Sequence, residues 1–519
     1  MKALRAAGYA AFFFLWVATG LAAQDVNLRS HDGAVEISGT LLGFDGEFYR
    51  VDSIYGELTV DGSGVSCEGP GCPDLLNFVA EMTVSGSSTI GQVLMPALIE
   101  AFALRNNLRA DRAQNEDGQF TYTLSEKDSG DVKGRFLFRV TNTDEGFADL
   151  LADEADIVMS LREIRETETV LAREAGLGDL QGPNRNRVLA LDAMVPVVAP
   201  ANPVNAISLH DLARVLGGQV TNWAQLGGED APMTVHLRDE RSGISQAVED
   251  RLLLPADLVL SATLTRHGTN EALAQAIADD PFGLGIVSYS EIGNTKPLIL
   301  IGECGFSLRS TRRTIKTEDY PLTAPMFLYM PARRLPKLGR DFLSFTRSPV
   351  AQIVIRRAGF VDQAPEEVPI DNQGDRLANA VLVAEGDDGL ANLKRMIDVL
   401  TPMKRLTTSF RFEAGSARLD AQSRSNVQQL ARSLEAGEYD TRRLLFVGFS
   451  DGVGPAEPNL TIARRRAEAV RNAVLEAAET ANLNRLDVDI DAFGEAMPMA
   501  CDDTQWGRQV NRRVEVWVQ

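Results

Sequence analysis

The stretch ALDAMVPVVAPANPVNAISLHDLARVLGGQVTNWAQLGG, residues 190–228, sets the pattern for the largest part of the chain. Its apolar, β-branched run up to Pro200 predicts a buried strand, and the dipeptide Asn202-Pro203 predicts a turn. The amphipathic segment ISLHDLARVL then predicts a helix, followed by the loop signals TNW and LGG. A strand, a turn and a helix in this order are typical of an α/β unit.

The same alternation extends over residues 79–365. Strand-like runs at 155–161, 187–200, 283–292 and 326–331 are separated by amphipathic segments. This pattern predicts an α/β architecture with mainly parallel strands, in a region long enough for two lobes.

The N-terminus predicts export. Lys2 and Arg5 precede an apolar run, and small residues up to Ala23 suit cleavage before Gln24. We therefore interpret residues 1–23 as a signal peptide and expect a periplasmic protein. The alternative is a retained membrane anchor, but the run is short for a spanning helix of about 20 residues.

The charge balance bears on the choice of partner. The chain has 52 Lys and Arg against 72 Asp and Glu, and loss of the two signal-peptide cations changes the net charge from −20 to −22. DNA and RNA are excluded as expected partners, because their phosphate backbones require basic patches. Small anions are not excluded, because they respond to local dipoles.

The four cysteines fall into two groups. Cys67 and Cys72 enclose the turn-rich EGPG, which predicts a short local disulfide. Cys304 and Cys501 either pair across domains or stay free. No CxxC spacing exists and the histidines are scattered, so we expect no metal and no cofactor; they are His31, His210, His236 and His267.

Two smaller regions flank the α/β part. Residues 24–78 alternate between apolar and polar residues, with turn signals HDG, FDG, YGE and DGSG, and predict a five-stranded SH3-like or Sm-like β unit for interaction or spacing. The acidic stretch VDQAPEEVPIDNQG, 361–374, predicts a linker, and residues 366–403 a linker and a helix. Residues 404–519 follow the order β-α-β-α-β…β, which predicts an α+β sandwich.

A strand-to-helix corner offers donors for an anion. Ser87, Ser88 and Thr89 fall at or just before the first turn of a helix, where free amide N–H groups carry the positive dipole end. Pro96 predicts a kink or a restart near Met95. The alternative is that the hydroxyls only cap the helix. The expected apolar face is Ile90, Leu94, Leu98 and Phe102.

Two other corners carry similar groups. Asp156 precedes a strand that Ser160 and Arg162 follow, and Arg238 precedes a further helix start at Ser242-Gly243-Ile244-Ser245. Ligands of open α/β sheets lie at the carboxyl ends of strands. The three corners could therefore converge on one oxyanion.

These stretches carry a family resemblance. VSGSSTIGQVLMP, ADIVMS with Arg162, residues 190–228 and LRDERSGIS together resemble PstS-type periplasmic phosphate-binding proteins over about 79–365. The resemblance implies a type 2 periplasmic binding protein fold, two lobes closing on an anion, with an ABC permease as a partner to consider. The implied ligand residues are Ser87, Ser88, Thr89, Asp156 or Ser160, Arg238, Ser242, Gly243 and Ser245.

The resemblance has one departure and one open role. Ile244 stands where the family favours a hydroxyl, and Ser245 offers a replacement. A carboxylate such as Asp156 could accept a proton from hydrogen phosphate and so reject sulfate. Pairing of Asp156 with Arg162 is the alternative, and we favour it slightly.

The last region carries a second resemblance. FEAGSARLD, VGFSDGVGPAEPN, RRRAEAV, AFGEAMP and GRQVNRRVEV resemble the OmpA-like peptidoglycan-binding domain over 404–519. The resemblance implies that Asp451 and Arg466 grip the ammonium and carboxylate of diaminopimelate, with Asn459 between them. Arg512 and Arg513 are expected to brace the loop. A solvated helix face is the alternative for the arginine run.

Three functions compete. The first is a periplasmic protein that binds phosphate or a related oxyanion and is held non-covalently to peptidoglycan. The second is a structural or signalling envelope protein whose binding fold no longer serves transport. An enzyme would need an activated nucleophile or a metal cluster, and neither is visible, so we predict no catalytic residues.

Overall fold

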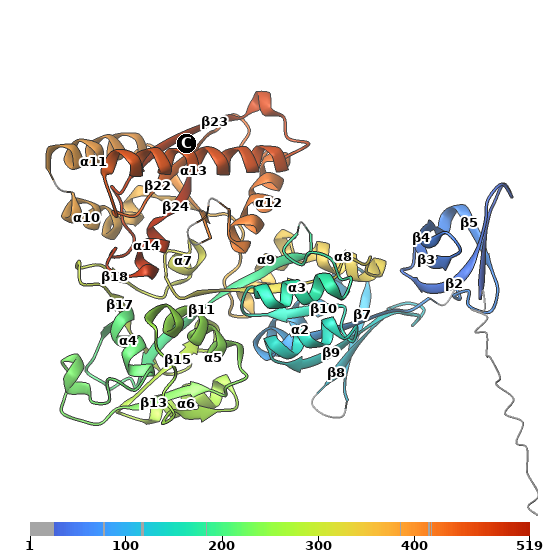
Figure 1. Cartoon of the computed structure of the whole chain (residues 1–519), viewed down its shortest axis with the longest axis horizontal. Helices are drawn as coiled ribbons and strands as arrows, with labels where there is room; N and C mark the ends of the chain where they lie inside the picture. Colours follow the sequence, from blue (N-terminus) through green and yellow to red (C-terminus); the bar gives the residue numbers. More distant parts are fainter. Residues whose placement is uncertain are drawn as a thin grey trace, which may run out of the picture. The chain divides into compact units, whose positions relative to one another are not determined.

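The computed structural model describes residues 25–519 except 76–77, 116–118, 183, 385, 414–415 and 417 (Figure 1). The predicted signal peptide lies outside the described residues. The chain forms two compact units, Met1–Ala80 and Glu81–Gln519, each considered by itself below. Among the described residues, no helix is both long and apolar enough to cross a membrane.

The first unit is a five-stranded antiparallel sheet in the order β4-β3-β2-β1-β5, which confirms the predicted all-β region. Its core gathers around Leu28, Tyr49 and Val51, all fully buried. Cys67 and Cys72 form the predicted disulfide. The strands are β1 (Val26–Ser30), β2 (Glu36–Phe44), β3 (Phe48–Ser53), β4 (Gly56–Asp61) and β5 (Val65–Glu68).

One mixed sheet runs through both lobes of the α/β region. The two lobes share β11 (Asn186–Val198), which pairs with β19 (Thr323–Tyr329) and, beyond Met194, with β15 (Gly283–Ser288) (Figure 1). The first lobe contains β6 (Ala80–Ser87), β7 (Leu108–Gln114), β8 (Phe120–Glu126), β9 (Val132–Thr141), β10 (Ile157–Ser160), α1 (Met95–Arg105), α2 (Thr143–Leu151), α3 (Glu166–Glu174), α8 (Lys337–Phe345) and α9 (Pro349–Arg357).

The opening stretch of sequence connects the two lobes and begins the second. Its strand is β11, and the predicted helix is α4 (Leu209–Leu216), capped by the Ser208 side chain. The second lobe also contains β12 (Ala206–Ser208), β13 (Thr234–Arg238), β14 (Thr265–His267), β16 (Lys296–Pro297), β17 (Ile299–Ile301), β18 (Ser307–Leu308), α5 (Gly243–Val248), α6 (Asn270–Asp279) and α7 (Arg312–Lys316).

The expectation of mainly parallel strands was wrong. Strands β6 and β10 are parallel, as are β13, β14 and β15, but β7, β8 and β9 are antiparallel, and β11 is antiparallel to β15, β16 and β19. Short connections explain the antiparallel pairing of β7, β8 and β9, because strands joined by a tight turn can only pair antiparallel.

The C-terminal region is the predicted α+β domain, with strand order β20-β21-β24-β22-β23. The expected linker is part of it, because β20 (Glu367–Pro369) pairs with β21 (Lys404–Arg411) and the next two helices pack around buried Trp517. The other elements are β22 (Arg443–Phe449), β23 (Asp487–Gly494), β24 (Arg513–Val518), α10 (Gly374–Val383), α11 (Gly386–Leu400), α12 (Ala421–Glu435), α13 (Ala456–Ala477) and α14 (Gln505–Asn511).

Covalent, ionic and hydrogen bonds join this domain to the α/β region within the second unit. Cys304 and Cys501 form a disulfide, which resolves the alternative left open by the sequence. Arg405 and Asp319 form a buried ion pair at 2.6 Å. The Trp506 indole donates to a backbone carbonyl of the second lobe at 2.6 Å. The two regions therefore form one folded body.

Candidate functional site

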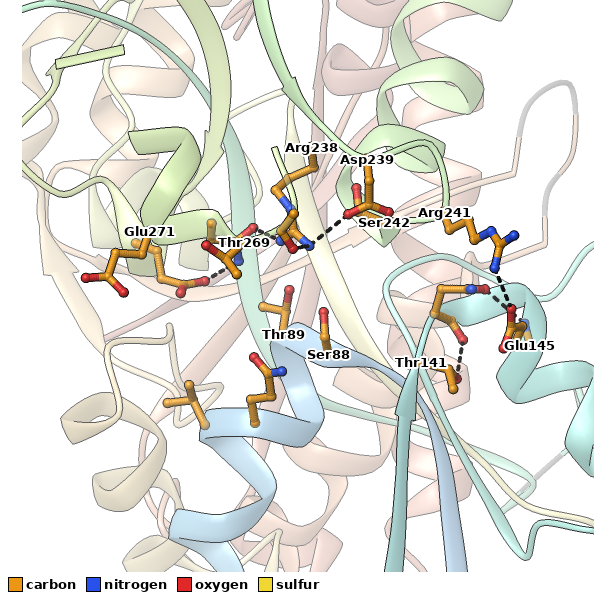
Figure 2. Close-up of a pocket in the computed structure, with 16 residues that line it drawn as sticks. Ser88, Thr89, Thr141, Glu145, Arg238, Asp239, Arg241, Ser242, Thr269 and Glu271 are labelled. Carbon is orange, nitrogen blue, oxygen red and sulfur yellow. Dashed lines mark hydrogen bonds and ion pairs between the residues drawn. The ribbon is translucent and has the colours of Figure 1, made fainter. Parts of the chain in front are cut away.

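A cavity of about 470 Å³ lies between the two lobes (Figure 2). Two of the three predicted corners contribute side chains to the cavity lining, and the corner of Asp156, Ser160 and Arg162 does not. Of the predicted residues, Ser88, Thr89, Arg238 and Ser242 line the cavity.

The first corner forms as the sequence indicates. Strand β6 ends at Ser87, helical backbone begins at Ser88, and a π-helical turn precedes α1, which begins at Met95. The predicted restart is therefore confirmed. Gly86 has φ of 123°, and a Cβ there would lie 2.3 Å from the Met159 carbonyl oxygen. Only glycine lets β6 approach β10 this closely.

The hydroxyls of Ser88 and Thr89 are free to bind a ligand. Neither has a hydrogen-bond partner among the residues that the structure describes, and both are drawn between the lobes in Figure 2. Thr89 is 7% exposed, and its unpaired hydroxyl still has access to the cavity that the residue lines. An anion in the cavity could accept a hydrogen bond from it.

Arg238 faces these hydroxyls from the second lobe and is 6% exposed. Its Nε donates to the His267 carbonyl at 3.1 Å, and its Nη2 donates to Asp239 Oδ2 and the Gly268 carbonyl at 3.1 and 2.9 Å. Its Nη1 donates one hydrogen to Asn270 Oδ1. A guanidinium has five N–H donors, so one on Nη1 remains for a ligand.

The helix start after Arg238 differs from the expectation. Ser242 caps α5 by accepting from the Ser245 amide at 3.2 Å, which leaves its own O–H free to donate. Ser245 is fully buried and its hydroxyl donates to the Arg238 carbonyl at 2.9 Å. Ser245 therefore does not replace the hydroxyl absent at Ile244.

Asp156 does not face the cavity. Its Oδ2 accepts from the Thr83 amide at 2.8 Å and its Oδ1 from Arg333 at 2.8 Å. The expected pairing with Arg162 is wrong, because Arg162 pairs with Glu168 at 2.7 Å. Asp156 thus ties β6 to the segment before α8, which is a structural role.

Three other predicted residues also lie outside the cavity lining. Ser160 is fully buried and donates to the Arg162 carbonyl at 2.6 Å. Ser87 is buried at the end of β6. Gly243 packs against Leu161, where a Cβ would come within 2.7 Å of Cδ1. These residues pack inside the strand-to-helix corners and do not line the cavity.

The lobes are in contact across the cleft. A cation or an amide of one lobe bonds a carboxylate of the other in three places: Arg165 to Asp250 at 2.9 Å, Gln246 to Asp144 at 2.7 Å and Arg241 to Glu145 at 3.6 Å. These contacts join the lobes beside the cavity, which is still partly open to solvent.

Sequence reasoning missed the carboxylates of the cavity, which are Glu145, Asp239, Glu271 and Glu291. Asp239 adjoins Arg238 in the sequence, so a signal existed. Glu145 and Glu271 stand in the first turns of α2 and α6, where acidic residues are ordinary partners of the helix dipole. No local signal distinguishes them.

The predicted peptidoglycan-binding residues lie on α13 and on the loop before it, between β22 and α13. Asp451 Oδ2 accepts from Arg512 at 2.7 Å, so Arg512 braces the loop as expected. The Arg466 guanidinium lies 5.2 Å above the Phe412 ring, and burial, then the nearby Arg512, lowers its pKa. Asn459 is buried and bonds a loop carbonyl at 3.3 Å.

Comparisons with known proteins match two regions of the chain to families. Residues 79–350 match the PBP superfamily domain and residues 411–512 the OmpA family. Protein SphX of Synechococcus elongatus is 26% identical over 234 residues, 43% of this chain and 67% of that protein. Phosphate-binding protein PstS of Borreliella burgdorferi is 24% identical over 200 residues, 37% of this chain and 71% of that protein.

The C-terminal region and the fold have their own matches. Outer-membrane lipoprotein YfiB of Pseudomonas aeruginosa is 34% identical over 101 residues, 20% of this chain and 56% of that protein. An ABC-type phosphate transport receptor from Vibrio cholerae is 21% identical, with a TM-score of 0.42, over 54% of this chain and 99% of that one.

Proposed function

The chain belongs to the PBP superfamily through residues 79–350, and on that premise we propose that its interlobe cavity binds phosphate or a related tetrahedral oxyanion. Relatives over this region include proteins named as phosphate-binding. The protein acts as a binding protein rather than an enzyme, in keeping with relatives of that kind.

One observation carries the proposal. The unpartnered hydroxyls of Ser88 and Thr89 face Arg238 across the interlobe cavity, and Arg238 keeps one free N–H. Hydrogen bonds from these donors to an anion would be charge-assisted and therefore stronger than neutral ones. The helix that starts at Ser88 adds its positive dipole end.

Isothermal titration of the full-length protein tests the proposal. Inorganic phosphate is expected to bind, and Ser88→Ala to weaken that binding by removal of one donor. If phosphate, sulfate, molybdate and arsenate all give no heat of binding, oxyanion capture is refuted. Turnover of a chromogenic phosphate ester would contradict a function without catalysis.

The C-terminal domain places the protein in the cell envelope. It belongs with relatives named as an outer membrane porin and an outer-membrane lipoprotein. Within the periplasm, it holds the protein to peptidoglycan by gripping diaminopimelate. The Asp451 carboxylate would accept from the ammonium, and the Arg466 fork would donate to the carboxylate. The pairing of Arg512 with Asp451 supports this role, because it fixes the carboxylate in place.

Retention on purified sacculi tests the tether. Asp451→Ala and Arg466→Ala are each expected to abolish retention. Arg465→Ala is the matched control, because Arg465 is an exposed arginine on the same helix. Equal retention of both site variants and the control would refute the assignment.

The loss of transport function is a second candidate. It is favoured by Ile244, which offers no hydroxyl, and by Ser245, whose hydroxyl points inward to a backbone carbonyl. Phosphate uptake in a deletion strain separates the candidates. Reduced uptake at low phosphate supports transport through a permease, and normal uptake with a leaky envelope supports the second.

A further inference from the structure

We infer that the interlobe cavity selects a phosphorus oxyanion that also carries an ammonium group, such as an aminoalkyl phosphate ester. This inference rests on the proposed function, because it assigns the anionic end of the ligand to the same hydroxyls and arginine. It adds a second recognition element, formed by Glu271 and Glu291, for the cationic end.

The charges that line the cavity are unequal. Two arginines and four acidic residues line it, and Glu271 is exposed to solvent as well. The guanidinium of Arg241 lies 3.6 Å from Glu145, and that of Arg238 lies 3.1 Å from Asp239. These two pairs leave the carboxylates of Glu271 and Glu291 without a cationic partner among the residues that the structure describes. A ligand that brings its own cation would complete the site.

Separate side chains are available to bind the anionic end of the ligand. Thr89 is more than nine-tenths buried, its hydroxyl has no partner in the described part of the chain, and it faces the cavity beside Ser88. Arg238 contributes its one unused N–H. These groups are donors open to the cavity, and an oxyanion between them could accept from all three.

The two ends of the site are adjacent. Asn270 accepts from Arg238 through its side-chain oxygen and donates to Glu291 through its amide. One short side chain therefore separates the guanidinium from the nearer free carboxylate. Figure 2 places Glu271 on the opposite side of Arg238 from Asp239. A short aliphatic spacer between phosphorus and nitrogen fits this separation.

The volume also favours an organic ligand. The cavity of about 470 Å³ falls in the range of roughly 300 to 1,000 Å³ typical of sites for organic molecules. The two lobes are in contact beside the cavity at Arg165–Asp250 and Gln246–Asp144. A bare tetrahedral ion would leave much of this space to water.

Isothermal titration of the full-length protein with matched ligands tests the inference. O-phosphoethanolamine is expected to bind about tenfold more tightly than monoethyl phosphate, which lacks only the amine, because its ammonium can form ion pairs with the two carboxylates. Glu271→Gln and Glu291→Gln should each reduce this ratio about threefold or more. Glu229→Gln makes the same charge change at an exposed position of the same lobe and should leave the ratio unchanged.

The outcomes separate the two claims. If inorganic phosphate binds but the two esters bind equally, the inference is overturned and the proposed function stands. If no phosphorus ligand binds, both fail. Glycerophosphoethanolamine carries the same ammonium on a diester, so tighter binding of this compound than of the monoester would assign the ligand to a lipid headgroup. Thermal unfolding of each variant establishes that it is folded.

Discussion

Replacing Thr89 by valine should weaken anion binding without lowering the stability of the fold. Valine has nearly the same shape and lacks only the hydroxyl. Thr89 is 7% exposed, and its hydroxyl has no hydrogen-bond partner among the described residues, so it contributes no bond to the folded protein. Removal of an unpaired buried polar group is neutral or stabilising.

The size of the binding loss follows from the bond that is removed. A hydrogen bond to a charged group contributes about 1.5 to 3 kcal/mol. Since about 1.4 kcal/mol corresponds to a tenfold change in affinity, Thr89→Val should raise the Kd for phosphate by about 10-fold to about 150-fold. Titration calorimetry measures the Kd, and urea denaturation of the same preparation measures the stability.

Thr143→Val is the matched control. Thr143 is fully buried and its hydroxyl accepts from the Leu161 amide at 3.2 Å, but it does not line the cavity. Valine there leaves that amide unpaired, which should cost about 1 to 3 kcal/mol of stability with little change in Kd. If Thr89→Val loses stability as Thr143→Val does and still binds normally, its hydroxyl is structural and the site is misassigned.

Three further predictions concern the joint between the α/β region and the C-terminal domain. Burial, reinforced by nearby carboxylates, raises the pKa of Glu318 from 4.5 to about 8. Between these two pH values the folded state binds more protons than the unfolded state, so the free energy of unfolding should fall as pH rises through this range. Glu318→Gln should flatten the curve of the free energy of unfolding against pH by up to about 1.4 kcal/mol per pH unit. Parallel curves for the variant and the wild type would contradict this. Cys304→Ser removes the disulfide to Cys501, 197 residues away, and should cost up to about 5 kcal/mol in denaturant; reductant should abolish the difference from wild type. Arg405→Met leaves buried Asp319 with only the more distant Arg411 at 3.8 Å as an ion-pair partner, at a cost of up to about 3 to 5 kcal/mol, part of which Asp319→Asn should restore in a double-mutant cycle.

The corners of the candidate site were predictable because their signals are local. A hydroxyl-rich turn before an apolar helix places Ser88 and Thr89 at a helix start whatever the rest of the fold does. The same holds for Ser242, three residues before Ser245. Which hydroxyl turns to the cavity was not predictable, because Ser245 finds the Arg238 carbonyl only once the strand and the helix have packed.

Partners distant in the chain explain the other errors. Asp156 lies 177 residues from Arg333, so no pattern of sequence indicates that the two pair. Arg162 was the nearer cation along the chain, but it pairs with Glu168 on α3. The carboxylates of Glu271 and Glu291 reach the cavity from separate elements of the second lobe, and each has an ordinary local context.

The expected linker at 361–374 failed for a related physical reason. Acidic segments are expected to stay in water, because burial of unpaired charge is costly. Asp362 is nevertheless fully buried, and Lys316 donates to it at 2.8 Å and to Glu366 at 2.7 Å. A hydrogen bond from Arg312 is the largest cause that lowers the pKa of Glu366, to about 2. Both cations stand on α7, about 50 residues earlier. An acidic stretch is therefore a linker only if no cationic helix can neutralise it; here α7 does, and the chain continues as one folded unit, Glu81–Gln519.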